Sequence, residues 1–135
     1  MRTKLLVAAA AIALLPAAAP VAAHHSFAAE FDASKPFKLT GVVTKVEWQN
    51  PHTIFYLDIT DERTKKVTNW SFEMGSPNGL MRKGWTRNSL KEGDKITVDG
   101  YLAKDGAHLA NARTVALADG RKVFAGAADD GGPSK

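Results

Sequence analysis

The chain has 135 residues, contains no cysteine, and carries 18 basic and 14 acidic side chains. This length favours a single domain. The lack of cysteine excludes disulfides, thiolate metal sites and cysteine nucleophiles. Two basic residues, Arg2 and Lys4, belong to a segment that we expect to be removed, which leaves a formal charge of only +2. Because a nearly balanced domain has little electrostatic attraction to nucleic acid, we predict no nucleic-acid partner.

Residues 1–23 have the pattern of an export signal. A basic start precedes an apolar run over residues 5–15, which has the length of a signal-peptide core and is too short to span a bilayer. Small residues at 21–23 form a cleavage signal, and we place the cut between Ala23 and His24. The sequence therefore predicts a periplasmic or secreted protein with no membrane span after the signal is removed.

The mature chain is expected to begin with an irregular arm over residues 24–36, in which Phe27 and Phe31 pack on the domain edge. At the other end, residues 126–135 are rich in glycine, alanine and aspartate, and we predict a disordered tail. The domain between them is predicted to span residues 37–125.

The first strand is predicted over residues 37–48. Its inward side chains change phase: Leu39 is on one parity, and Val42 and Val46 are on the other. We expect a β-bulge at the switch, Gly41-Val42, because glycine tolerates the local distortion. A long, bulged first strand is typical of small closed barrels.

The later elements alternate with turn signals. Strands are predicted over residues 53–60, 67–74, 95–102, 109–118 and 121–124. A short helix over residues 77–83 is predicted from Ser76 as N-cap, Pro77 at the first helical position and Gly84 at the end, with a second helical turn over residues 86–90.

This order of elements predicts an all-β fold, an OB-fold-like barrel of five to six strands with a short helix between strands three and four. A two-sheet β-sandwich is the alternative. In an OB-fold, the loops after strands one and four flank the binding face. Here those loops contain His52 and His108.

Several motifs resemble a family of small exported bacterial proteins catalogued as domain of unknown function 6152. They are the His-His-Ser-Phe start at residues 24–27, Gly-x-Val-x-x-Val-x-Trp-x-Asn-Pro-His at 41–52, Trp-Ser-Phe-Glu at 70–73 and Gly-Trp-Thr at 84–86. The resemblance covers almost all of the mature chain. It implies a periplasmic location and an OB-like barrel, and it brings no catalytic residues.

Cleavage before His24 would leave an α-amino group beside an imidazole, and these two nitrogens can chelate one metal ion. A second imidazole would complete a histidine brace, and His25, His52 and His108 are the candidates. Nitrogen ligands suit copper, nickel and zinc, with copper first. The alternative is that these histidines are structural: His52 ties down its turn, and His108 is solvated.

Aromatic side chains suggest a second kind of site. Trp48, Tyr56 and Trp85 are candidates for a stacking platform, and Asn50 in the adjoining turn completes the predicted ligand-binding set. The alternative is that the tryptophans Trp48 and Trp70 are core or edge-covering residues.

We assign no catalytic residue. Glu73 lies opposite Trp70 and Phe72 in strand phase and is expected to face solvent. The sequence therefore predicts a monomeric, exported, non-enzymatic binding module, with a divalent transition metal, copper first, as its ligand. Two alternatives stay open: an interaction module that binds a small molecule or an envelope protein without metal, and an enzyme of unknown class.

Overall fold

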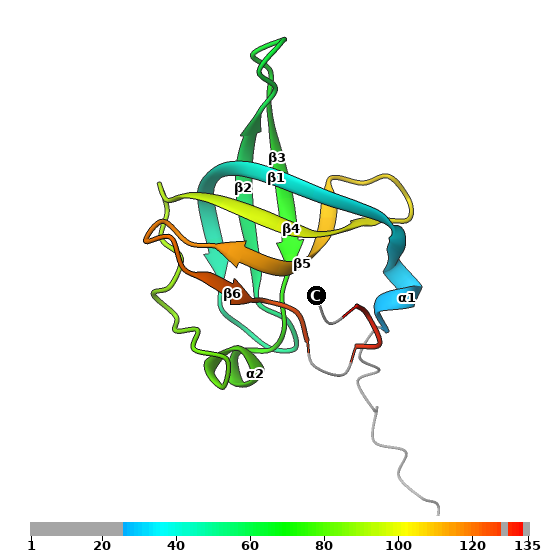
Figure 1. The fold of residues 1–135 in the computed structure, drawn as a ribbon, viewed down its shortest axis with the longest axis vertical. Coiled ribbons are helices and arrows are strands. Elements are labelled where there is room, and N and C mark those ends of the chain that lie inside the picture. Colours follow the sequence, from blue (N-terminus) through cyan, green and yellow to red (C-terminus); the bar gives the residue numbers. More distant parts are fainter. Residues whose placement is uncertain (1–25, 128–129, 134–135) are drawn as a thin grey trace, which may run out of the picture.

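The strands of the protein close into a small barrel (Figure 1). The computed structural model describes residues 26–127 and 130–133. Its elements are α1 (Phe27–Glu30), β1 (Phe31–Glu47), β2 (Ile54–Thr60), β3 (Val67–Glu73), α2 (Pro77–Met81), β4 (Lys95–Ala103), β5 (Leu109–Ala116) and β6 (Lys122–Phe124). The strand order is β3-β2-β1-β4-β5-β6, and β3 also pairs with β5. This pairing joins β3, at one edge of the sheet, to β5, the strand before β6 at the other edge. It closes β1 to β5 into a ring, so the OB-like barrel is confirmed and the β-sandwich is excluded.

The long strand β1 takes part in two halves of the barrel. Its residues 36–42 pair with β4, and its residues 42–47 pair with β2. Val42 is the shared position, with Asp58 on one side and Lys95 on the other. At the preceding residue, Gly41, a Cβ atom would lie 2.7 Å from the Asp58 carbonyl oxygen. Glycine is needed here because β2 passes too close for a side chain.

The predicted bulge at Gly41-Val42 is wrong in position. The register of β1 against β2 shifts between Val43 and Lys45 instead. Val43 is buried, whereas Val42 is 41% exposed. Inward positions therefore continue through Gly41 to Val43 and change parity only beyond it. The glycine marks a close approach of two strands, and sequence alone does not distinguish this from a bulge.

The barrel interior is filled by aromatic and branched side chains. Phe55 and Phe72 stack with ring centroids 5.1 Å apart, and Phe37 and Trp70 flank Phe72. The helix α2 covers the lower end of the barrel in Figure 1. Its Leu80 is fully buried in the same core.

The signals that predict α2 are confirmed, and its end comes two residues early. The Ser76 hydroxyl accepts a hydrogen bond from the Gly79 amide at 3.2 Å. The helix ends at Met81, and Gly84 follows with a φ of +92°. Residues 86–90 form a turn rather than a second helical turn, because the Ser89 hydroxyl accepts the hydrogen bond of the Thr86 amide.

The arm is more regular than predicted. Phe27 begins the short helix α1, and β1 already begins at Phe31, which pairs with Ala103 of β4. Phe27 and Phe31 are buried and form a second hydrophobic cluster with Ala103, against Tyr101 and Leu109. The prediction that both phenylalanines pack on the domain edge is confirmed. Burial of these rings is what orders the arm.

The described residues near the C-terminus contact the rest of the domain. In Figure 1 the red C-terminal segment lies beside α1. Its Ala125 oxygen accepts a hydrogen bond from the Gly75 amide, and its Asp130 oxygen accepts one from the Phe27 amide, both at 2.8 Å. We call residues 125–127 and 130–133 the C-terminal segment.

Across residues 26–127 and 130–133, no helix is long and apolar enough to cross a membrane.

Candidate functional site

The loop between β1 and β2 is held against the end of β3. The Thr53 amide donates to the Gly75 oxygen at 3.0 Å, and the Met74 amide donates to the Thr53 oxygen at 2.8 Å. This pairing places the His52 ring so that its Nδ1 lies 3.1 Å from the Met74 oxygen. Because a carbonyl oxygen only accepts, Nδ1 carries the proton and the neutral ring has its lone pair on Nε2. A backbone carbonyl fixes metal-binding histidines in the same tautomer.

A carboxylate lies close to the same ring. Glu73 Oε1 is 3.7 Å from His52 Nδ1, and the two side chains are only 16% and 11% exposed. The prediction that Glu73 faces solvent is therefore wrong. Glu73 does project from the outer face of β3, as its phase indicates, but the His52 loop folds over that face. The loop and Glu73 are about twenty residues apart in the chain, so no local sequence pattern indicates that one buries the other.

His108 is in a different place from His52. Its ring packs on Trp70 with centroids 4.8 Å apart, and its backbone oxygen accepts a hydrogen bond from the Ser71 amide. His108 is bonded to Ser71 of β3, and His52 to Met74, just beyond the end of β3. These two partners are three residues apart, which is about 10 Å along a strand. Within the described ranges, no three His, Cys, Asp or Glu side chains are close enough to hold a metal ion. The predicted ligands His24 and His25 lie outside the described residues.

The predicted stacking platform does not form. Trp85 is buried, with 2% exposure, and its indole Nε1 donates to the Phe124 oxygen at 2.8 Å. Trp48 is half-buried and packs on the core, as the alternative reading expected. Tyr56 projects from the outer face of β2, away from Trp85, while Asn50 is exposed. Trp85 is thus a core residue, unable to stack with a ligand on the surface.

Tyr56 belongs to a polar group on the outer face of β1 and β2. The Glu47 carboxylate accepts hydrogen bonds from the Lys45 ammonium and from the Tyr56 hydroxyl, the latter at 3.0 Å. Chiefly the Lys45 bond, and then the Tyr56 bond, lowers the pKa of Glu47 below its ordinary 4.5. Partial burial raises the pKa of Tyr56. Because the pKa of Glu47 falls on folding, this group stabilises the fold above the ordinary carboxyl pKa and loses that contribution as the pH falls.

We expect Lys45→Met to raise the pKa of Glu47 toward its ordinary value by more than Tyr56→Phe does, because the lysine bond has the larger effect. NMR titration of the side-chain carboxyl carbons measures both shifts. The pKa of Asp119, lowered by hydrogen bonds from Arg121, serves as internal control and should not change. A larger shift in the tyrosine variant would contradict this assignment.

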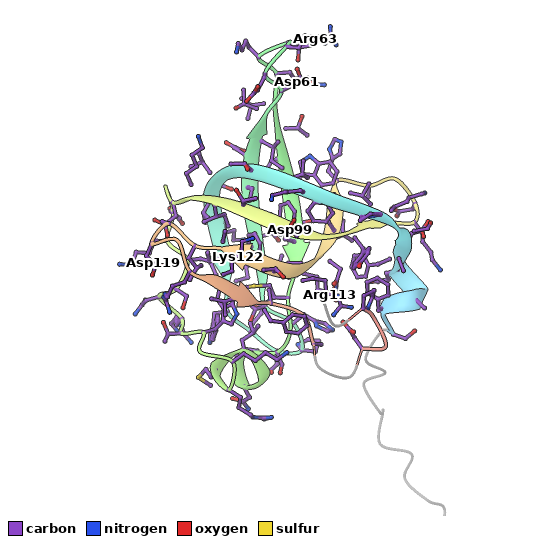
Figure 2. All side chains as sticks on the ribbon, viewed as in Figure 1. Asp61, Arg63, Asp99, Arg113, Asp119 and Lys122 are labelled. Atoms are coloured by element: carbon purple, nitrogen blue, oxygen red, sulfur yellow. The ribbon has the colours of Figure 1, made fainter. Side chains whose placement is uncertain are left out.

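A buried ion pair joins β5 to the C-terminal segment. Arg113 is 2% exposed, its Nη2 donates to Asp130 Oδ1 at 3.0 Å, and its guanidinium lies 4.8 Å from the Phe27 ring centroid. Figure 2 shows Arg113 on the side of the barrel that faces the C-terminal segment. Neither residue was among the predicted site residues. The signal was the single charged residue of a predicted strand, at its centre, where a charge is seldom buried unless it is paired.

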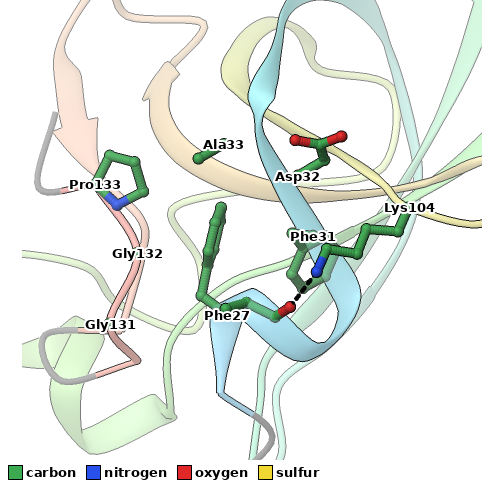
Figure 3. A pocket seen from close by; sticks show the side chains of 9 residues that line it. Phe27, Phe31, Asp32, Ala33, Lys104, Gly131, Gly132 and Pro133 are labelled. Carbon is green, nitrogen blue, oxygen red and sulfur yellow. Dashed lines mark hydrogen bonds between the residues drawn. The ribbon is translucent and has the colours of Figure 1, made fainter.

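An open cavity lies between the arm and the C-terminal segment (Figure 3). Its volume is about 510 Å³, which is the size of a small-molecule site. The lining residues come from the arm, β4–β5 loop and segment: Phe27, Ala28, Phe31, Asp32, Ala33, Lys104, Gly131, Gly132 and Pro133. The Lys104 ammonium donates to the Ala28 oxygen across the cavity wall, as the dashed line in Figure 3 shows.

Comparison with known proteins identifies the family and no activity. A search of curated proteins found no match. The sequence profile described as "Family of unknown function (DUF6152)" matches residues 11–112, which is more than half of the chain. The matched range contains His24, His52 and His108, and it ends within β5. The chain therefore belongs to this family of unknown function.

Proposed function

We propose that the mature chain is an exported, non-enzymatic module that binds a divalent transition metal ion, copper first, through His24 and His52. The observation that carries the proposal is the hydrogen bond from His52 Nδ1 to the Met74 oxygen at 3.1 Å. It holds the ring in the tautomer whose lone pair is on Nε2, the atom that would bind the metal and that is buried among the described residues. Removal of the signal at Ala23 would add the His24 imidazole and its α-amine, and nitrogen ligands favour copper among the divalent ions.

The test is calorimetric titration of Cu(II) into protein that begins at His24, with N-terminal sequencing of exported protein to establish the cut. Acetylation of the His24 α-amine is expected to weaken binding at least about tenfold, since it removes the amine from the chelate. His52→Ala is expected to do the same, because losses of this order accompany defects in metal sites. His108→Ala is the matched control and should bind as the parent does. Unchanged binding after acetylation of the α-amine would overturn the proposal.

The second candidate is an interaction module that binds a small molecule or an envelope protein without metal. The open cavity of about 510 Å³ beside the arm favours it. On this reading His52 only ties down its loop. His52→Ala would then leave Cu(II) binding unchanged and lower the free energy of unfolding by about 1 kcal/mol, the usual worth of one hydrogen bond.

A further inference from the structure

Arg113 lies at an irregularity in β5. Ala112 and Thr114 pair with two consecutive residues of β4, so Arg113 has no partner on that strand. A bulge of this kind redirects a side chain, and bulges are over-represented beside functional sites. The guanidinium is buried against the arm, 4.8 Å from the Phe27 ring centroid. The backbone of β5 therefore presents one arginine to the region between the arm and the C-terminal segment.

The ion pair with Asp130 uses only part of this guanidinium. A single hydrogen bond joins them, from Arg113 Nη2 to Asp130 Oδ1 at 3.0 Å. Arg113 Nε and Nη1 are buried with no hydrogen-bond partner among the described residues. Leaving a buried donor unpaired is costly, and a carboxylate binds a guanidinium best through two parallel hydrogen bonds. Asp130 therefore leaves binding capacity that a carboxylate free of the chain can use.

The C-terminal segment is held over the arginine by polar contacts. Asp130 Oδ1 also accepts the Gly132 amide at 2.8 Å, and the Asp130 backbone oxygen accepts the Phe27 amide at 2.8 Å. Residues 130–133 are half-buried or exposed and carry no large apolar side chain. Segments with few buried apolar contacts open at a low cost in free energy. Asp130 can therefore leave the arginine without disturbing the barrel core.

The open cavity ends close to the same arginine. Gly132 lines this cavity of about 510 Å³, and the Phe27 ring lines it as well (Figure 3). A Cβ atom at Gly132 would overlap Arg113 Nη2, so this glycine touches both the cavity and the guanidinium. The cavity wall carries one carboxylate, Asp32, and one ammonium, Lys104, so its charges are balanced toward an anion. Displacement of the C-terminal segment would connect the cavity with the arginine.

We propose that Arg113 binds the carboxylate of a small molecule whose apolar part lies in this cavity, and that Asp130 occupies the arginine as an internal competitor. The inference rests on the second candidate function, binding of a small molecule without metal, and it names the class of ligand. The ligand carboxylate takes the place of Asp130 and bonds to two nitrogens of Arg113, while its apolar part lies beside Phe27 and Phe31. The competitor lowers the apparent affinity by the fraction of molecules in which the arginine is free.

The test uses benzoate, which joins a carboxylate to an apolar ring, with benzamide as the uncharged probe. In Asp130→Asn, benzoate is expected to bind at least about tenfold more tightly than in the parent, because the side chain keeps its shape and the competing charge is gone. Benzamide should bind both proteins alike. In NMR spectra, the Arg113 Nε–H signal should shift with benzoate, since it gains an acceptor.

The matched control is Asp32→Asn. It removes an equal charge from the wall of the same cavity, but its carboxylate bonds to Ser34 and not to Arg113. Benzoate affinity should change less than about twofold, since charges at the surface are screened by salt. Equal benzoate affinity in Asp130→Asn and Asp32→Asn would show that Asp130 is no competitor.

The NMR signals separate this inference from the function on which it rests. If the probes shift the amides of Phe31 and Lys104 but benzoate leaves the Arg113 signal unchanged, the small-molecule function stands and the role of Arg113 falls. If neither probe shifts those amides in any variant, both fall.

A double variant, Asp130→Asn with Arg113→Met, covers the case that Asp130→Asn does not fold. It removes both buried charges, and apolar residues usually replace a buried ion pair without loss of stability. The parent should prefer benzoate to benzamide, and the double variant should bind the two probes alike. A preference for benzoate that survives in the double variant would overturn the proposal.

Discussion

Gly100→Ala is expected to lower the free energy of unfolding by about 3 kcal/mol, the upper range for overpacking a closed interior. A Cβ atom at Gly100 would overlap the Asn111 carbonyl oxygen and would lie 3.1 Å from a ring carbon of Phe37. The Asn111 backbone has little freedom to move away, because β5 is paired with β4 on one side and with β3 on the other. Urea unfolding measures the change.

The matched control is Gly79→Ala. A Cβ atom at Gly79 would meet only the Ser76 hydroxyl, at 3.2 Å, and the residue lies in the helix α2. Alanine favours a helix over glycine by about 1 kcal/mol, so this variant should unfold at the same or a slightly higher urea concentration. If both substitutions cost the same, the close approach of β4 and β5 is not what Gly100 provides.

Trp85→Ala is expected to cost about 3–5 kcal/mol, as is usual when a large buried aromatic is truncated. The side chain is 2% exposed and is part of the barrel core, and its indole donates to the Phe124 oxygen at the end of β6. Truncation leaves a cavity next to α2. It also removes the hydrogen bond from the Trp85 indole to the end of β6. Chemical unfolding followed by far-ultraviolet circular dichroism measures the loss.

Trp85→Phe separates the two effects. It keeps most of the apolar volume but removes the indole hydrogen bond, so a smaller loss, nearer 1 to 2 kcal/mol, is expected. A near-neutral Trp85→Ala would mean that the tryptophan is not part of the core, and it would revive the surface platform that the sequence suggested.

The candidate metal site depends on the closure of the barrel. His52 lies after β1, its carbonyl partner Met74 follows β3, and the arm is held through Arg113 of β5. The strand that holds the His52 loop, β3, and the strand that holds the arm, β5, pair in parallel, with Glu73 beside Asn111. A substitution that separates β3 from β5 should therefore affect the fold and the proposed site together.

Local features of the fold could be predicted from the sequence. Alternation of apolar and polar residues located β2, β3 and β4 to within one residue at each end. The cap at Ser76 located the start of α2, because capping depends on hydrogen bonds within three residues. The order of the strands was enough to predict the OB-like barrel, and the motifs were enough to indicate the family.

Only the tertiary structure decided the contacts made by residues far apart in the chain. Val42 and Val43 have the same local pattern, and the strands on either side of β1 decide which one is buried. The strand phase predicts that Glu73 faces solvent, but in the structure the His52 loop covers it. The tail has a composition typical of disorder, yet Asp130 finds Arg113 across the fold. Periodicity and capping depend on residues a few positions apart. Strand pairing, the burial of a side chain under a loop and the partner of a charged residue depend instead on which distant segments the closed barrel brings together.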